Sequence, residues 1–240
     1  MTNQSAEALP GLEARLAGFL YLLNIAAGAF TYGFVRSTTI TPGDAGTTAA
    51  NILQHALLYR WGFVAGIVPV LCNVPLALIF YDLFKVVNRS FSALVAFFIL
   101  VATAIESANL LNYYAPLILL EGADASAFKP EQLHAFAYMS LSLHAIGFNV
   151  AVVFFAFYDL LIGYLIFRSG FLPRILGVLM AVAGLCYLTS SLASFLSPRF
   201  AAHLLPYILM PSAVGELALS LWLLVMGVDV ENWSKQAYAA

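Results

Sequence analysis

The most regular feature of the chain is a series of long apolar runs separated by short polar stretches. Each run has about 20 residues or more, the length that an α-helix needs to cross the hydrocarbon layer of a membrane. The strands of a membrane β-barrel would instead alternate apolar and polar residues. The pattern predicts six membrane-spanning helices, at about residues 16–35, 61–84, 91–119, 143–167, 175–196 and 208–228.

Composition agrees with this prediction. The 240 residues are 62% hydrophobic and 9% charged, so the polar surface is too small to solvate a water-soluble globule. No Ser-, Gly- or Pro-rich linker divides the chain. We expect an all-α protein with one transmembrane domain over residues 16–228, an N-terminal segment at 1–15 and a tail at 229–240.

Charge suggests an orientation and limits the partners. Six basic residues flank the two predicted turns on one side and the two chain ends, against four on the other side; the six are Arg15, Lys85, Arg89, Arg168, Arg174 and Lys235. By the positive-inside rule, we expect a bacterial plasma membrane protein with both termini in the cytoplasm. The net charge is −2 with no basic block, which argues against nucleic acid. The expected partner is the lipid bilayer, and the oligomeric state stays open.

The second and fourth predicted spans carry the same landmarks in the same order. The paired landmarks lie 76 to 79 residues apart and are His55 and His134, Asn73 and Asn149, Asp82 and Asp159, and Arg89 and Arg168. This near-constant offset suggests two parallel copies of one hairpin. A fainter third copy would begin near His203, which gives three short outer helices at about residues 46–59, 130–138 and 198–207. The alternative is coincidence in a chain rich in Phe, Tyr and Leu.

Two glutamates, Glu106 and Glu216, lie inside predicted spans. A charged group at that depth costs about 2.5 to 3.5 kcal/mol on insertion scales, so each needs a partner or an aqueous cavity. Glu106 shares a helix face with Asn109, and Glu216 shares one with Ser212 and Ser220. We predict that the two carboxyl groups face one mid-membrane pocket and share a proton. The alternative is two neutral glutamates that only hold helices together.

Four other polar residues in the spans are candidates for the same pocket: Asn24, Asn73, Asn149 and His144. Hydrogen bonding between helices is the ordinary role of such amides, and ligand contact is the alternative. A structural hydrogen bond is the ordinary role of the histidine. The alternative is titration near neutral pH.

Charged residues near the ends of spans are candidates for surface ion pairs, namely Asp44, Arg60, Asp159 and Arg168. We expect Asp44 to cap a helix and to pair with Arg36 or Arg60. Asp159 lies within reach of Arg168 or Arg174 if their side chains snorkel. A role in a proton path is the alternative for Asp159.

The sequence gives little support for a metal or a cofactor. His55, His134 and His203 would meet only if the threefold arrangement holds, and no His-x-x-x-His or Cys-x-x-Cys spacing supports a metal. The chain has no P-loop, dinucleotide fingerprint or nucleophile elbow. We therefore expect no metal and no cofactor, and no catalytic residue can be named.

Several motifs resemble those of a known family. They are residues 41–45 with Thr48-Ala49 and Asn51-Ile52, Arg60 with Gly62-Phe63, residues 163–174, and Gly215-Glu216 followed by residues 221–224. With these motifs the chain resembles an uncharacterised bacterial family of membrane proteins, domain of unknown function 4386, over nearly its whole length. The resemblance implies a multi-pass helical protein and no assigned reaction. It places Asp44, Arg60, Arg168 and Glu216 inside family-like motifs.

The functional expectation is a protein that binds or moves a small apolar ligand or protons through the mid-membrane pocket. Pro69 with Pro75, and Pro211 with Gly215, favour it, because interrupted helices expose backbone groups to a cavity. One alternative is an intramembrane acid/base enzyme acting on a lipid or isoprenoid. Another is a structural or accessory subunit.

Overall fold

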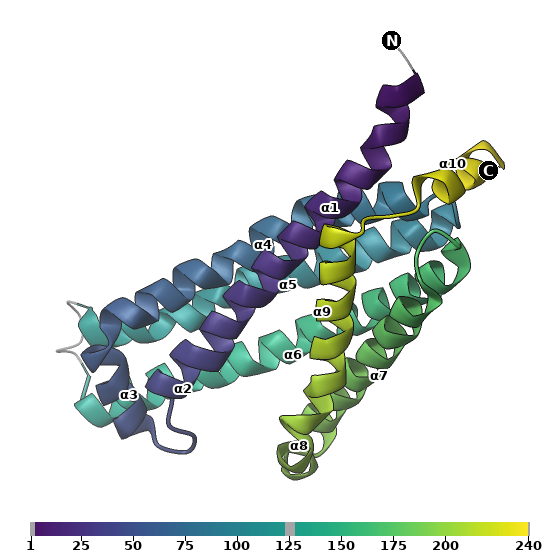
Figure 1. The fold of residues 1–240 in the computed structure, drawn as a ribbon. Coiled ribbons are helices and arrows are strands. Elements are labelled where there is room, and N and C mark those ends of the chain that lie inside the picture. The colour runs from purple at the N-terminus through teal and green to yellow at the C-terminus, as the bar shows by residue number, and fades with distance from the viewer. Residues whose placement is uncertain (1–2, 123–127, 240) are drawn as a thin grey trace. The chain divides into compact units, whose positions relative to one another are not determined.

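The computed structural model describes residues 3–122 and 128–239, and the regular structure within these ranges is helical (Figure 1). The helices are α1 (Asn3–Gly28), η1 (Ala29–Val35), α2 (Arg36–Thr39), α3 (Ala45–Gln54), α4 (Ala56–Phe84), α5 (Arg89–Glu121), α6 (Pro130–Ser169), α7 (Arg174–Leu196), α8 (Pro198–Leu204), η3 (Tyr207–Leu209), α9 (Met210–Val225) and α10 (Val230–Ala239). The all-α prediction is confirmed.

Six helical segments of the described chain are long and apolar enough to cross a membrane. They are Pro10–Thr39, Ala56–Phe84, Arg89–Glu121, Pro130–Ser169, Arg174–Leu196 and Tyr207–Val225. Large apolar side chains on them are exposed, such as Leu71 and Leu111, at 67% and 73%. Surfaces of this kind require an apolar surrounding. The prediction of a multi-pass membrane protein is confirmed.

The chain divides into two compact units. Unit 1 comprises the described residues of Met1–Leu23, Cys72–Thr103 and Asn149–Ala240, and unit 2 comprises Asn24–Leu71 and Ala104–Phe148. Helices α1, α4, α5 and α6 contribute residues to both units, whereas α7 and α9 belong to unit 1 alone.

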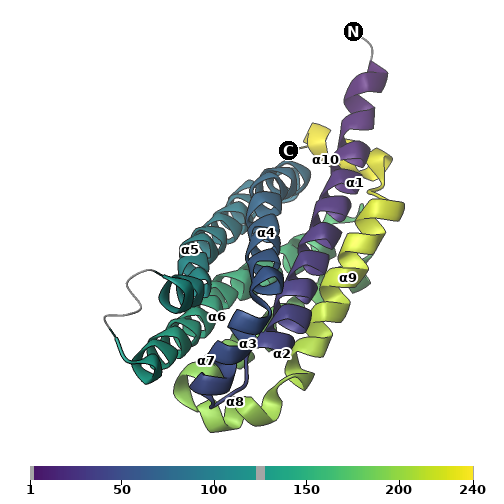
Figure 2. The ribbon, with the colours of Figure 1, turned by 90° about the vertical axis from the view of Figure 1, so that its left-hand side faces the viewer.

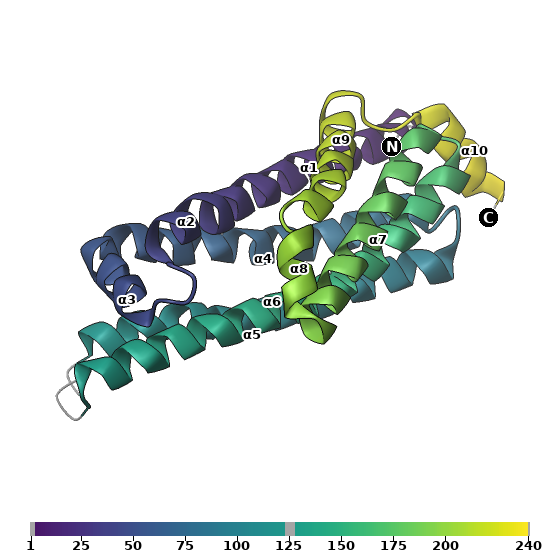
Figure 3. The ribbon, with the colours of Figure 1, turned by 90° about the horizontal axis from the view of Figure 1, so that it is seen from below.

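Small residues allow the helices of unit 1 to pack closely. Gly163 of α6 and Gly177 of α7 face each other, and a Cβ atom on either would lie 2.6 to 2.7 Å from the other's carbonyl oxygen. Gly18 of α1 likewise lies against the backbone of α9, and the two helices run side by side in Figure 2. Helix α7 also packs on α9, which Figure 3 shows from another side. Close backbone approach is the usual way in which helices associate in lipid.

The C-terminal tail forms helix α10, which binds two helix ends of unit 1. Trp233 donates its indole N–H to the Leu83 carbonyl over 2.9 Å, and Gln236 donates to the Ser169 carbonyl. Both acceptors lie in the last turn of a helix, where carbonyl groups have no partner within the helix. Helix α10 therefore donates a hydrogen bond to one terminal carbonyl of α4 and one of α6.

In unit 2, Asp44 is the N-cap of α3. Its carboxylate accepts the backbone N–H of Thr47 over 2.9 Å and the Thr47 hydroxyl over 2.7 Å. The predicted cap is thus confirmed. The predicted pairing of Asp44 with Arg36 or Arg60 is wrong, because Asp44 takes part in none of the ion pairs among the described residues. Arg60 pairs instead with Glu121 and also donates to the Tyr114 hydroxyl. Both partners lie on α5 and reach Arg60 of α4 only in the folded protein.

The predicted short helix at residues 130–138 is wrong as a separate element, because it is the first part of α6. The start of α6 has Pro130 in its first turn, and the Lys129 N–H donates to the Gln132 side chain over 3.0 Å, which are ordinary helix-start signals. At about 1.5 Å per residue this helix of 40 residues is roughly twice as long as the hydrocarbon layer is thick. Helix α8 matches the prediction at 198–207 more closely. The duplication itself stays a prediction.

Candidate functional site

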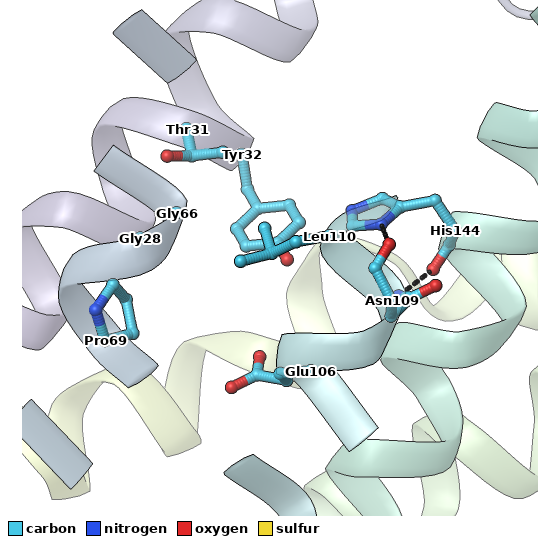
Figure 4. A pocket seen from close by; sticks show the side chains of 9 residues that line it. All are labelled: Gly28, Thr31, Tyr32, Gly66, Pro69, Glu106, Asn109, Leu110 and His144. Carbon is cyan, nitrogen blue, oxygen red and sulfur yellow. Dashed lines mark hydrogen bonds between the residues drawn. The ribbon is translucent and has the colours of Figure 1, made fainter. Parts of the chain in front are cut away.

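Unit 2 contains a small cavity between the membrane spans, shown in Figure 4. Its volume is about 20 Å³, which is room for a water molecule, since one needs about 10 to 15 Å³. It is lined by Gly28, Thr31, Tyr32, Gly66, Pro69, Glu106, Asn109, Leu110 and His144. The first span, α4, α5 and α6 all contribute to its wall.

The backbone of the first span changes geometry beside this cavity. The α-helix ends at Gly28, and Ala29–Val35 forms the π-helical segment η1, which carries Thr31 and Tyr32. Short π segments inside helices occur frequently at functional sites. The Thr31 hydroxyl donates to the Gly62 carbonyl over 3.2 Å and holds η1 against α4. A Cβ atom on Gly28 would meet nothing within 4 Å, so its missing side chain leaves space at the cavity.

Glu106 places a carboxyl group on the wall of this cavity. In Figure 4 its side chain extends from α5 toward the side that carries Pro69. None of the hydrogen bonds found within the described chain involves the Glu106 carboxyl group, although Tyr32 is close enough to be affected by its charge. The carboxyl group therefore faces the cavity itself.

His144 and Asn109 are held by a reciprocal pair of hydrogen bonds (Figure 4). The Asn109 amide donates to the His144 carbonyl over 2.8 Å, and His144 Nδ1 lies 3.1 Å from the Asn109 carbonyl oxygen. Because a carbonyl only accepts, Nδ1 carries the hydrogen, which leaves Nε2 as a bare acceptor in the neutral ring. Nε2 is buried and has no hydrogen-bond partner among the described residues. One ring nitrogen of His144 is thus held by a hydrogen bond, and the other can accept a proton.

The aromatic surroundings fix the His144 ring. It stacks on Tyr32, with centroids 6.2 Å apart and planes 9° apart, and meets Tyr113 edge-on at 5.4 Å. Gly147 is needed for this packing, because a Cβ atom there would lie 2.5 Å from the Asn109 amide oxygen.

The structure brings together three of the predicted pocket residues and places the others elsewhere. Glu106, Asn109 and His144 line the cavity, whereas Asn24, Asn73 and Asn149 are not among its lining residues. Each of those three asparagines takes part in an interaction with another group. Glu216 belongs to unit 1, so its predicted pairing with Glu106 would join the two units and stays a prediction.

Glu216 lies in a second polar cluster within unit 1. The hydroxyl groups of Tyr21 and Tyr187 donate hydrogen bonds to its carboxyl group, and its charge also acts on Asp159. The predicted surface ion pair of Asp159 is wrong, because its side chain is 0% exposed and neither carboxyl oxygen has a partner in the described chain. Arg168 is exposed and takes part in none of the ion pairs among the described residues.

Sequence reasoning missed several residues of these two sites. It did not single out Tyr32 or Gly66 as neighbours of Glu106, nor Tyr158 and Tyr187 as neighbours of Glu216. It expected a broken helix at Pro69 and Pro75, but α4 is continuous and the irregular segment is η1. Gly28, just before η1, and Gly33, within it, were the available sequence signal for this irregular segment.

No metal centre can be built from the described residues. They contain no group of three or more His, Cys, Asp or Glu side chains placed to hold a metal ion. The three-histidine arrangement is therefore not formed within this part of the chain.

Comparison with known proteins places the chain in a family. An uncharacterized protein of Archaeoglobus fulgidus is 26% identical over 158 residues, which cover 66% of this chain and 78% of that protein. No solved structure matches the chain. The family described as "domain of unknown function (DUF4386)" matches residues 16–227. With nearly all of its helical spans matched, the chain belongs to the DUF4386 family.

Proposed function

We propose that this protein binds and moves protons through the cavity lined by Glu106. The observation that carries the proposal is a carboxyl group within a membrane span that borders space for water and receives no hydrogen bond from the described chain. Acidic and histidine side chains at such depth are the usual components of proton relays in pumps and transporters.

The size of the cavity favours protons over an apolar ligand. About 20 Å³ accepts a water molecule but is far below the roughly 300 Å³ or more of ordinary ligand pockets. Water can bridge a carboxyl group and an imidazole, and both line this cavity. The sequence alternatives of an apolar ligand and of a lipid-modifying enzyme gain no support from this volume.

His144 supplies a second proton acceptor. The Asn109 carbonyl holds the hydrogen on Nδ1, so Nε2 is the nitrogen that can take up a proton. Glu106 and His144 both line the cavity, and proton exchange between them through water is part of the proposal. The hydrogen bond from Nδ1 to the Asn109 carbonyl keeps the ring in place during such a cycle.

Proton flux into vesicles tests the proposal. The purified protein is reconstituted into liposomes that contain a pH-sensitive dye, and a potassium diffusion potential that is negative inside is applied. We expect internal acidification with wild type and flux at the level of protein-free vesicles with Glu106→Gln. Glu131→Gln, at an exposed position in the first turn of α6, is the matched control and should behave as wild type. Equal flux for wild type and Glu106→Gln, or none above background with wild type, overturns the proposal.

The same proposal includes the plasma membrane and an orientation with both termini in the cytoplasm. It is supported by the six basic residues on that side against four on the other. A single cysteine is placed at Ser90 or at Ser197 in a variant without Cys72 and Cys186. A membrane-impermeant reagent should label the cysteine at 197 in intact cells and the cysteine at 90 in inverted vesicles. Labelling of both positions from the same face would contradict the orientation.

A further inference from the structure

Asp159 of α6 is buried in unit 1 without a partner for its charge. It is 0% exposed, and neither of its carboxyl oxygens has a hydrogen-bond partner in the described chain. Helix α7 closes over it at Gly184, where a Cβ atom would lie 3.1 Å from Asp159 Cβ. An ionised carboxylate in such a place carries a large desolvation cost, and such groups become neutral instead.

Glu216 of α9 has the opposite surroundings. It is partly exposed, and it accepts hydrogen bonds from Tyr21 of α1 and Tyr187 of α7. Tyr158 extends this chain of donors, because its hydroxyl donates to that of Tyr21 over 3.4 Å. Donors stabilise an ionised carboxylate. The hydrogen-bond network therefore converges on Glu216 and does not reach Asp159.

The groups that face the two carboxyls come from four helices. They are Tyr21 of α1, Tyr158 of α6, Tyr187 of α7 and, from α4, the ring of Phe80, which contacts both Tyr21 and Tyr158 and does not titrate. No basic side chain of the described residues contributes a charge at Asp159 or Glu216. Two negative charges here would repel each other without compensation, so the pair holds at least one proton.

We propose that Asp159 and Glu216 form a second proton-binding site, in which Asp159 keeps a proton and Glu216 is the group that takes up and releases another. The asymmetry follows from the surroundings, because the tyrosine donors favour charge on Glu216 and the closed packing excludes charge on Asp159. The site lies wholly in unit 1 and does not depend on the proposal for Glu106.

Tight helix packing makes this site rigid. Gly215, next to Glu216, lies against the backbone of Leu179, and a Cβ atom there would be 2.9 Å from the Leu179 carbonyl oxygen. Ser212, one turn earlier, donates to the Ala183 carbonyl over 3.1 Å. Helix α9 is thus fixed on α7 on the side that presents Glu216.

Infrared spectroscopy of the full-length protein in lipid nanodiscs tests the proposal. A protonated carboxyl group has a C=O stretching band that an ionised one lacks, and aspartate labelled with ¹³C at the side-chain carboxyl shifts this band for aspartates alone. At neutral pH we expect one label-sensitive carboxylic band from wild type. Its absence would show that Asp159 is ionised and would overturn the proposal. Glu106 contributes nothing to this signal, so the result is independent of the proposed proton path.

Three variants assign the bands. Asp159→Asn should remove the label-sensitive band, and Asp229→Asn, at an exposed position, should leave it unchanged. On acidification, wild type should gain a glutamate carboxylic band that Glu216→Gln lacks, while the aspartate band persists in that variant. Persistence of the labelled band in Asp159→Asn, or an unchanged titration in Glu216→Gln, overturns the assignment. If a variant does not fold, the labelled wild type still decides whether Asp159 is protonated.

Discussion

The Glu106 cavity of unit 2 and the Asp159–Glu216 cluster of unit 1 place the same chemical group in two different settings. A glycine contributes to each setting, in opposite ways. At Gly28 the missing side chain leaves open space, whereas at Gly184 and Gly215 it allows a neighbouring backbone to come into contact. A carboxyl group beside open space can be hydrated, and one beside a packed backbone must obtain its partners from the protein. The residue type alone therefore does not define the role of an acid in a membrane span.

The largest expected effect is on stability and distinguishes these two roles of glycine. In Gly184→Ala the new Cβ atom would lie 2.6 Å from the Ala156 carbonyl oxygen, and we expect a loss of about 3 kcal/mol, the upper part of the range for overpacking. Gly28→Ala should be neutral or stabilising, because nothing lies near its Cβ position and alanine favours a helix. Thermal unfolding in the same detergent compares the two. A similar loss in both variants would contradict the distinction.

Removal of the amide that bonds the His144 backbone carbonyl should have the next largest effect. Asn109→Ala removes the hydrogen bond from its amide to the His144 carbonyl and the one that it accepts from Asn112, which together are worth about 2 kcal/mol. Ser140→Ala removes a hydrogen bond of an exposed side chain to its own helix and serves as the control. The midpoint of unfolding measures both. An unchanged midpoint for Asn109→Ala would mean that the hydrogen bonds of its side chain do not contribute to stability.

The tyrosines of the two sites should respond differently. Tyr187→Phe removes a donor to Glu216 and should destabilise the protein by about 1.5 kcal/mol, as expected for a hydrogen bond to a charged group. Tyr32→Phe keeps the stacking on His144 and should change stability by less than about 0.5 kcal/mol. Unfolding of both variants, measured side by side, tests the contrast. The comparison fails if Tyr32→Phe proves the more damaging of the two.

The smallest effect lies outside both sites, at the exposed cap of α3. The hydrogen bonds from Thr47 lower the pKa of Asp44 below its usual value of 3.8, so its contribution is present above that value and is lost as the pH falls through the lowered pKa. We expect the amides at the start of α3 to lose protection against exchange, relative to their intrinsic rates, in acid. Asp44→Asn, which still accepts hydrogen bonds but does not titrate, should lose this dependence. Persistence in that variant would assign the effect to another group.

The sequence by itself determined the six spans and part of the cavity. Hydrophobicity along the chain is a local property, so runs long enough to cross a membrane predict helices that the structure contains. Glu106 and Asn109 lie three residues apart, and residues at that spacing share a helix face whatever the helix packs against. Both line the cavity.

Only the tertiary structure decided which groups surround these acids. His144 reaches the cavity from α6, and the π-helical turn of the first span could not be derived from an apolar run. Asp159 has arginines nearby in sequence, yet α7 covers it and Glu216 of α9 is its charged neighbour. Burial and partners depend on contacts between helices that are distant in the chain, and such contacts leave no periodic pattern in the sequence.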